Sequence, residues 1–349
     1  MPVYVGVDFH ARTQTVCWCD PASGEVGERT LDHQRDDVVG FYAQFPAPAV
    51  VGVETSGFAQ WFHHLVEKRG HELRVGDAHA IRQLARRRQK NDRRDAALLL
   101  DLLLRGDFPV LHRPPAASRE VLHLLHHRRR LVRMSTMLKN SLHALALNHG
   151  LQRGPRLFSA EGRSTLQQLP LSPAEGWHRG DSWQLLAAVQ QRIAALDAEL
   201  EARAVADPRV ARVRTHPGVG RLTALAFVHS IEPVGRFLHS GQLAGYCGLD
   251  PQEHSSGERI RYGAISKQGN RLLRHWLTEA AHVAVRRGQD DQLRCFHGHL
   301  LARRKKPAVA IIAVARKLAL RLFVLLRDQI DYQEFRRRGR DAEGARDNA

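Results

Sequence analysis

The sequence predicts an α/β domain at the N-terminus, followed by a remainder that is mostly helical. Short apolar runs of the kind that form buried strands, such as Val3–Asp8 and Val50–Glu54, fall near the N-terminus. Farther along, apolar side chains recur at spacings of three and four, which is the period of an amphipathic helix. A chain of 349 residues has room for two or three domains.

Residues 1–112 are predicted to form the α/β domain. Turn formers and helix breakers separate its elements, for example the prolines of Pro46–Pro48 and the glycine Gly70. The expected elements are strands at Val3–Asp8, Thr13–Cys19 and Glu25–Leu31, a helix at Asp36–Phe45, a strand at Val50–Glu54, a helix at Phe58–Arg69, a strand at Leu73–Val75, a helix from near Ala80 and a helix at Asp92–Arg105. Three strands followed by alternating helices and strands is the element order of an RNase H-like fold.

Residues 113–206 are predicted to form a helical middle domain. Leu138, Leu142 and Leu145 fall on one helix face, and a second apolar stripe follows at Leu185, Val189, Ile193, Leu196 and Leu200. The segment Gly150–Asp181 between the stripes is rich in Gly, Pro and Ser and is expected to be a long connection. Two helices with one narrow stripe each fit a coiled-coil hairpin within one chain and an oligomer contact equally well.

Residues 207–330 are predicted to form a second compact domain, which is mostly helical. Its turn Pro217–Gly220 resembles a helix-hairpin-helix turn, in which Gly218 and Gly220 would let backbone amides approach a phosphate. A plain connection between two helices explains the same residues equally well. A basic helix at Gln268–Arg287 and an apolar helix at Pro307–Arg327 follow, and residues 331–349 are expected to be a charged, disordered tail.

Charge indicates the class of partner. The formal net charge is +17 and the isoelectric point is near 10.7, which is typical of a protein that binds a polyanion such as nucleic acid. No apolar run is long enough for a membrane span, and the N-terminal residues lack the pattern of a secretory signal. The four cysteines have neither zinc-ligand nor redox spacing, so we expect free thiols in a reducing cytoplasm.

Four acids have the arrangement of a metal site. Asp8 and Glu54 each end an apolar strand, and Asp92 and Asp95 lie three apart, on one face of a helix. Two carboxylates 4 Å apart repel by roughly 4 kcal/mol at an effective dielectric near 20, and divalent cations remove that cost. Taken alone, Asp92 and Asp95 are better explained by helix capping and ion pairing than by a metal site. Asp77 also follows a strand and is a rival ligand that we rank below Glu54.

Basic residues crowd three segments. Each run could be an ordinary solvated face, but the total charge favours contacts with a phosphate backbone. Near the acid pair and on the long helix, the candidates for nucleic-acid binding are Arg86, Arg87, Arg88, Lys90, Arg128, Arg129, Arg130 and Arg133. In the C-terminal domain they are Lys267, Arg271 and Arg274. Aromatic residues make up only 6% of the chain, so base stacking is not expected to be the main mode of binding.

One serine is a candidate nucleophile. Ser256 lies in a stretch of turn formers, between Ser255 and Gly257, with several arginines close behind. A hydroxyl is a weak nucleophile unless a base or a metal activates it, and no triad spacing accompanies this one. On chemistry alone, an ordinary loop serine is the better interpretation.

Together these motifs resemble the insertion-sequence 110 family of transposases, which are also called DEDD transposases or bridge-RNA-guided recombinases. The N-terminal likeness is carried by Val5–Asp8, Val51–Glu54 and Lys90–Ala96. The C-terminal likeness is carried by Pro217–Ala224, Leu243–Leu249, Ser255–Gly257 and Ile265–Asn270. The resemblance covers nearly all of residues 1–330. One departure is Asp77-Ala78, where many relatives have Asn-Pro.

The resemblance implies a RuvC-type RNase H-like domain, a coiled-coil domain and a C-terminal transposase domain. It implies that Asp8, Glu54, Asp92 and Asp95 bind Mg²⁺, as two ions and with Mn²⁺ as a substitute. It implies that Ser256 cleaves a DNA strand and holds it as a phosphoserine. Ser256 is chosen over Ser255 because the family's motif is a serine followed directly by a glycine. It also implies a structured noncoding guide RNA, and a composite site in a dimer or tetramer.

The sequence therefore predicts a transposase that excises and integrates an insertion sequence. Its expected partners are double-stranded donor and target DNA, the guide RNA and further copies of itself, with no membrane partner. Its expected location is the bacterial cytoplasm, at the nucleoid. The alternatives are a Holliday-junction resolvase-like nuclease that uses water, with Ser256 merely structural, and a nucleic-acid scaffold without catalysis.

Overall fold

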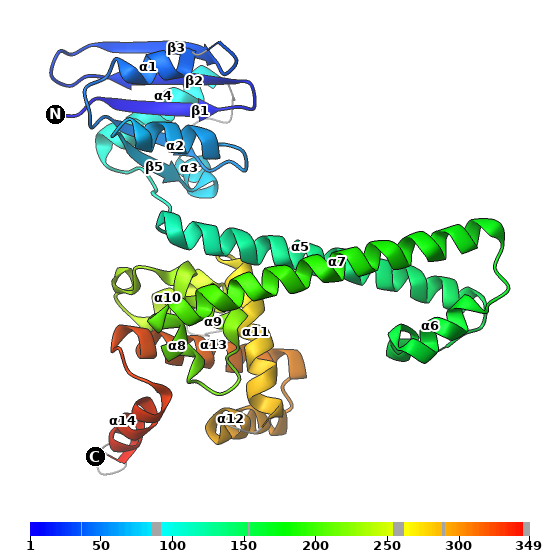
Figure 1. The fold of residues 1–349 in the computed structure, drawn as a ribbon. Coiled ribbons are helices and arrows are strands. Elements are labelled where there is room, and N and C mark those ends of the chain that lie inside the picture. The colour runs from blue at the N-terminus through cyan, green and yellow to red at the C-terminus, as the bar shows by residue number, and fades with distance from the viewer. Residues whose placement is uncertain (36, 85–91, 153, 254–261, 288–289, 345–349) are drawn as a thin grey trace. The chain divides into compact units, whose positions relative to one another are not determined.

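The protein is described here by a computed structural model of residues 1–349. The described residues exclude 36, 85–91, 153, 254–261, 288–289 and 345–349 (Figure 1). The chain divides into two compact units, Met1–Arg113 and Pro114–Ala349. Among the helices described, none is both long and apolar enough to cross a bilayer. The expected α/β N-terminal sheet and mostly helical remainder are confirmed.

The N-terminal unit is built on a five-stranded mixed sheet with the strand order β3-β2-β1-β4-β5. The first three strands pair antiparallel, whereas β1, β4 and β5 run parallel. The prediction placed the ends of these strands to within about one residue, because turn residues and helix breakers bound them in the sequence. The strands are β1 (Tyr4–Phe9), β2 (Thr13–Cys19), β3 (Val26–Asp32), β4 (Val50–Glu54) and β5 (Glu72–Gly76).

Helices cover both faces of this sheet (Figure 1). On one face, α1 (Asp37–Ala43) and α2 (Gln60–Lys68) bury aromatic and aliphatic side chains against the odd-numbered residues of β1 and β4. On the other face, α3 (Ala78–Leu84) and α4 (Asp92–Arg105) pack against Tyr4 and Val50. Since strand side chains alternate between faces, the even-numbered residues of β1 and β4 project toward α4.

The close approach of α4 to β1 requires a glycine. A Cβ atom on Gly6 would lie 2.4 Å from the carbonyl oxygen of Ala96 and 2.4 Å from the amide nitrogen of Leu100. Both are backbone atoms of α4, so they cannot rotate out of the way. The small residue therefore fixes the separation between β1 and the helix that carries Asp92 and Asp95.

We predict that Gly6→Ala will destabilise the N-terminal unit by about 1–3 kcal/mol, the usual cost of overpacking a core. The physical reason is that α4 must move off the sheet. The measurement is denaturant unfolding of the full chain, with Gly40→Ala on α1 as the control, because a Cβ atom there meets nothing within 4 Å. Equal stability of the two variants would contradict the packing argument.

The C-terminal unit begins with a long helical pair. Helices α5 and α7 lie side by side (Figure 1), and η1 and α6 pack against them through Leu142, Leu157 and Leu166. The elements are α5 (Ala116–Asn148), η1 (Gly154–Phe158), α6 (Ala160–Gln167) and α7 (Pro173–Ala206).

Two details of the middle region differ from the sequence prediction. The segment Gly150–Asp181, expected to be a long connection, instead contains η1 and α6. It ends at Ser172, because Ser172 and Glu175 form a capping box that starts α7 with Pro173. The predicted stripe included Leu185, but this side chain is 48% exposed, whereas Leu186 is 1% exposed. Only one of two adjacent leucines can face inward, and the packing of Leu186 with the α6 region sets the phase of the helix.

The rest of the C-terminal unit is a helical bundle around α13, whose inward side chains are almost fully buried. The inner ends of α5 and α7 contribute Val121, Leu125 and Leu200 to the same core. The helices are α8 (Pro208–Arg214), α9 (Arg221–Ile231), α10 (Ser240–Cys247), α11 (Arg271–Arg286), α12 (Asp291–Ala302), α13 (Pro307–Arg327) and α14 (Tyr332–Gly344), with the 3-10 helix η2 (Val234–Arg236). A small hairpin is formed by β6 (Pro251–Glu253) and β7 (Tyr262–Ile265).

The prediction of a disordered tail from residue 331 was wrong for the described part of that segment. Helix α14 begins at Tyr332, which is 6% exposed, and Phe335 packs against the bundle core. The Tyr332 hydroxyl donates a hydrogen bond of 2.7 Å to the buried carboxylate of Asp290. The charged residues that suggested disorder follow these two anchors, which the composition of the tail did not reveal.

Candidate active site

Two of the predicted acids lie at neighbouring strand ends. Strands β1 and β4 run parallel, with Val7 opposite Val53, so the next residues, Asp8 and Glu54, lie side by side at one edge of the sheet. Both have even numbers and therefore project toward the α4 face. The parallel pairing thus brings together two acids that are 46 positions apart in the chain.

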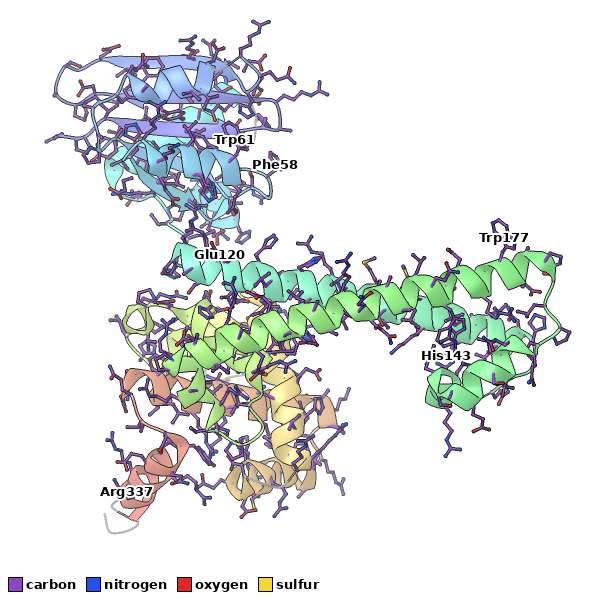
Figure 2. The ribbon with its side chains drawn as sticks, viewed as in Figure 1. Phe58, Trp61, Glu120, His143, Trp177 and Arg337 are labelled. Carbon is purple, nitrogen blue, oxygen red and sulfur yellow. The ribbon has the colours of Figure 1, made fainter. Side chains whose placement is uncertain are left out.

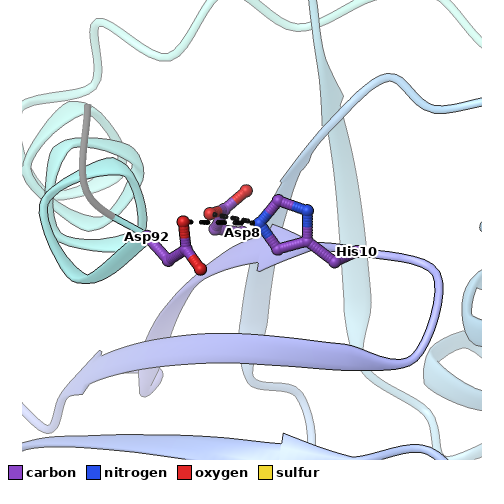
Figure 3. A group of neighbouring side chains, drawn as sticks. All are labelled: Asp8, His10 and Asp92. Atoms are coloured by element: carbon purple, nitrogen blue, oxygen red, sulfur yellow. Dashed lines mark hydrogen bonds and ion pairs between the residues drawn. The ribbon is translucent and has the colours of Figure 1, made fainter.

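Helix α4 supplies the other two acids. Asp92 is its first residue, and Asp95 lies nearly one turn later. Donor atoms of Asp8, Asp92 and a histidine, His10, all lie within 4.8 Å of one another (Figure 3). The side chain of Asp8 is 18% exposed, whereas those of His10 and Asp92 are 51% and 64% exposed, so the group opens to solvent.

His10 is a member of this group that the sequence analysis missed. Its Nε2 atom lies 3.1 Å from a carboxylate oxygen of Asp8 and 3.6 Å from one of Asp92. The available signal was its spacing, because a residue two positions after Asp8 tends to fall on the same side of an extended chain. A lone histidine after a strand is too common for that spacing to single it out.

The electrostatics of the group favour a bound cation. Partial burial raises the pKa of Asp8 above its ordinary value, and the negative charges of Asp95 and Asp92 raise it further, while His10 opposes the shift. A carboxylate that burial and two like charges destabilise is stabilised by a divalent cation. The donor set is mostly carboxylate oxygen, which suits Mg²⁺ and Mn²⁺. The residues present therefore fit a divalent metal ion.

The rival ligand Asp77 has a different role. Its Oδ1 atom accepts hydrogen bonds from the backbone amides of His79, at 2.7 Å, and Ala80, at 3.1 Å. These bonds cap the start of α3. The carboxylate is thereby occupied with a helix terminus, which supports the order of preference that placed Glu54 above Asp77.

The predicted basic residues are placed in different surroundings. Arg86, Arg87, Arg88 and Lys90 lie outside the described residues. On α5, Arg128 differs from its neighbours, because its guanidinium forms a two-pronged ion pair with Asp197 on α7, with distances of 2.9 and 3.0 Å. Arg221 also contacts Asp197, at 2.8 Å. Arg128 therefore holds α5 to α7, and this pairing removes it from the group of cations available to a phosphate.

Arginines of α5 and α11 form a basic group. Burial lowers the pKa of Arg129, and the like charges of Arg133 and Arg271 lower it further. The same arginines of α5 depress the pKa of His275 on α11, where burial is again the largest cause. Arg130 lies beside them and is exposed. Cations that weaken one another's protonation in this way form a natural site for a phosphate anion.

The remaining predicted residues lie at the ends of helices. Gly218 has a φ of +86°, and a Cβ atom on it would lie 2.7 Å from the backbone nitrogen of Ala284 on α11. Gly220 caps the start of α9. Arg274 donates a hydrogen bond of 3.0 Å to the carbonyl of Cys247, and Lys267 precedes α11 with a φ of +55°. Ser256 falls outside the described residues, in the segment between β6 and β7.

A mixed sheet with acids gathered at one edge, joined to a strongly basic helical unit, defines a class: enzymes that process nucleic acids at an acidic site. Comparison with known proteins is more specific. Residues 210–297 match the transposase family IS116/IS110/IS902, and residues 5–149 match the DEDD transposase domain of the IS110 type. The DEDD domain implies an RNase H-like fold for the N-terminal unit.

Individual relatives agree with the family matches. The chain is 29% identical to a probable family 20 transposase of Pseudomonas aeruginosa, over 94% of this chain and 98% of that protein. It is 32% identical to the transposase for insertion sequence element IS1111A of Coxiella burnetii, over 70% and 68%. It is 27% identical to the transposase for element IS1328 of Yersinia enterocolitica, over 82% and 85%. The chain belongs to the IS116/IS110/IS902 family of transposases and is a DNA transposase.

Proposed function

We propose that this transposase excises and integrates its insertion sequence by metal-dependent DNA cleavage, with Ser256 as the nucleophile and a noncoding RNA as the guide. The observation that carries the proposal is the gathering of Asp8, His10 and Asp92 within 4.8 Å, with Asp95 and Glu54 beside them. Such a group at the edge of an RNase H-like sheet suits the cleavage of phosphodiesters. The family membership makes DNA the substrate.

In this proposal, Asp8, Glu54, Asp92 and Asp95 would hold the divalent cation, either one Mg²⁺ or two. When bound, it would stabilise negative charge on the oxygens of the phosphodiester that is being cleaved. Asp8 and Glu54 belong to strands packed on both faces, which gives them fixed positions. His10 contacts Asp8 and Asp92 and orients the two carboxylates.

The covalent step that we propose conserves one phosphodiester bond. The Ser256 hydroxyl loses its proton to a nearby base, and its oxygen attacks the phosphorus of a DNA strand. The bond between phosphorus and one deoxyribose oxygen breaks, and that oxygen takes up a proton as a free hydroxyl. A hydroxyl from another strand then loses its proton and its oxygen attacks the phosphorus of the phosphoserine. The bond between phosphorus and the serine oxygen breaks, and that oxygen takes up a proton, which restores the serine. No external energy is required, because each bond broken is replaced by a similar one.

Several features support a large nucleic-acid partner. The cations at Arg129, Arg130, Arg133, Arg271, Arg274 and Lys267 would contact phosphates of donor DNA, target DNA or the guide RNA. The turn at Gly218–Gly220 would act as a helix-hairpin-helix contact. Helices α5 and α7 would form a coiled coil within the middle domain, 113–206, and connect copies in a dimer or tetramer with a composite site. Such a protein would act at the nucleoid.

The proposal is tested by trapping the covalent intermediate. The full-length protein is incubated with Mg²⁺, its guide RNA and end-labelled DNA carrying the element's termini, and then denatured. We expect a labelled protein–DNA adduct with the wild type and with Ser255→Ala, and none with Ser256→Ala. Cleavage without any adduct by Ser256→Ala would instead establish the resolvase-like mechanism, in which water is the nucleophile.

The same assay separates the remaining alternatives. Full activity on DNA after the RNA is stripped away would remove the guide and leave the serine chemistry intact. Binding of DNA with no metal-dependent cleavage in any variant would identify a scaffold and would overturn the proposed reaction.

A further inference from the structure

A connected group of aromatic rings runs from the core of the N-terminal unit to its surface. Phe9 on β1 stacks on Phe62 of α2, with ring centroids 5.3 Å apart, and on the ring of His33 at 4.9 Å. Phe9 also contacts two outer rings, Phe58 at 5.9 Å and Trp61 at 5.8 Å. The His33 ring meets Trp61 edge-on at 4.9 Å.

The outer members of this group are exposed although the inner ones are buried. Phe62 is 0% and Phe9 is 7% exposed, whereas Phe58 is 55% and Trp61 is 42% exposed (Figure 2). Large aromatic side chains contribute much to folding when they are buried, so two neighbouring rings at the surface indicate a binding role. The buried rings beneath them hold the two outer rings in place.

The aromatic surface lies at the same edge of the sheet as the acids. Phe9 directly follows Asp8, and the two side chains project to opposite faces of β1. Phe58 follows Glu54 by four residues, in the loop after β4. The turn between β1 and β2 carries His10 beside the acids, and it is tied to the aromatic group by a hydrogen bond of 2.9 Å from the amide of His33 to the carbonyl of Arg12. Arg12 is exposed and adds a positive charge there.

We propose that Phe58 and Trp61 form a stacking platform for an unpaired base of the DNA strand whose phosphodiester lies at the acids. This inference rests on the proposed function, since it places the platform within one strand's reach of the cleavage site. A base in duplex DNA has both faces covered by its neighbours, whereas an unpaired base can stack on a protein ring. The carboxylates would bind the DNA backbone through the cation, and Arg12 would contact an adjacent phosphate. The two rings would bind the unpaired base on the opposite face of the sheet, at the same edge.

The test compares single-stranded and duplex DNA with the full-length protein in the absence of divalent metal, so that nothing is cleaved. Binding is measured by fluorescence anisotropy with a labelled thymidine oligomer and with a duplex. We expect Phe58→Ala and Trp61→Ala each to weaken single-strand binding by about tenfold and to leave duplex binding nearly unchanged. Trp61→Phe should retain most of the affinity, because it keeps a ring.

The control is Trp177→Ala on α7, because Trp177 is 84% exposed and belongs to the other unit (Figure 2). An unchanged affinity for the single strand in both platform variants would overturn the proposal. So would a loss of self-association in sedimentation with unchanged DNA binding, which would assign the rings to a second copy. A loss confined to a ribonucleotide oligomer would overturn the assignment to DNA.

The binding result is independent of the serine chemistry. Adduct formation at Ser256 together with unchanged single-strand binding by the ring variants would reject the platform and retain the proposed function. Weakened single-strand binding by the ring variants, without any adduct at Ser256, would retain the platform and reject the serine chemistry of the proposed function.

Discussion

Replacing Asp8 by Asn is expected to lower the rate of DNA cleavage by at least about 100-fold. Loss of a partner that only orients a metal ligand already costs 10–100-fold, and Asp8 is proposed to be a ligand itself. The substitution keeps the shape of the side chain and removes the charge that Asp92 and Asp95 already oppose. The fold should therefore survive, because one source of repulsion is removed. The measurement is the single-turnover cleavage rate in Mg²⁺.

A matched control is Asp101→Asn on α4. This acid lies on the same helix but pairs with Arg105 at 2.8 Å, away from the sheet edge. It should cleave at the wild-type rate, since an exposed pair of this kind contributes little. If Asp8→Asn and Asp101→Asn cleave equally well, the acids at the sheet edge are not the active site.

The second large effect is expected from Asp290→Ala in the C-terminal bundle. Asp290 is 1% exposed and accepts hydrogen bonds from Arg321 at 2.6 Å, from Tyr332 at 2.7 Å and from the amide of Leu293 at 3.0 Å. Burial alone would raise the pKa of Asp290, but these hydrogen bonds and the charge of Arg321 outweigh it and lower the pKa. His216 packs beside the ion pair of Asp290 and Arg321. Burial lowers the pKa of its imidazole to about 4, so His216 is neutral near pH 7.

Removing Asp290 leaves the Arg321 guanidinium buried, and among the described residues the side-chain hydrogen bond that remains to it is the one to Gln292. A buried charge without its partner costs about 3–5 kcal/mol, which we expect as the loss in free energy of unfolding. Helix α14 should also detach, since Tyr332 loses its acceptor. The measurement is denaturant unfolding, with Asp291→Ala as the control because that neighbour is mostly exposed. A loss below about 1 kcal/mol would show that the network is not structural.

The positions of the acids could be predicted from the sequence better than those of the surfaces around them. Asp8 and Glu54 were predictable because each ends an apolar run, and ends of parallel strands meet at one edge of a sheet. Helix α4 and its acids followed from a 14-residue amphipathic pattern that begins with Asp92. His10 and the exposed rings Phe58 and Trp61 were missed, since what singles them out is the set of residues beside them in space. A low aromatic content did not reveal that a few rings gather at one edge.

In the helical regions, too, features set by the local sequence were predicted, whereas features set by tertiary contacts were not. The helix predicted from Pro307 to about Arg327 is found as α13, because its apolar composition and its proline start are local properties. The choice of Leu186 over Leu185 depends on the position of α6, which no local pattern specifies. Likewise, the order in α14 depends on the contact between Tyr332 and a residue 42 positions earlier, Asp290.

The most direct test of the acid site is a measurement of cation binding rather than activity. The full-length wild type and the variants Asp8→Asn and Asp92→Asn are titrated with Mn²⁺ and followed by electron paramagnetic resonance, with Asp101→Asn as the control. We expect the wild type and Asp101→Asn to bind Mn²⁺ in competition with Mg²⁺, and both site variants to bind it at least about tenfold more weakly. Equal Mn²⁺ affinity in all four proteins would contradict the proposal that these carboxylates hold the metal.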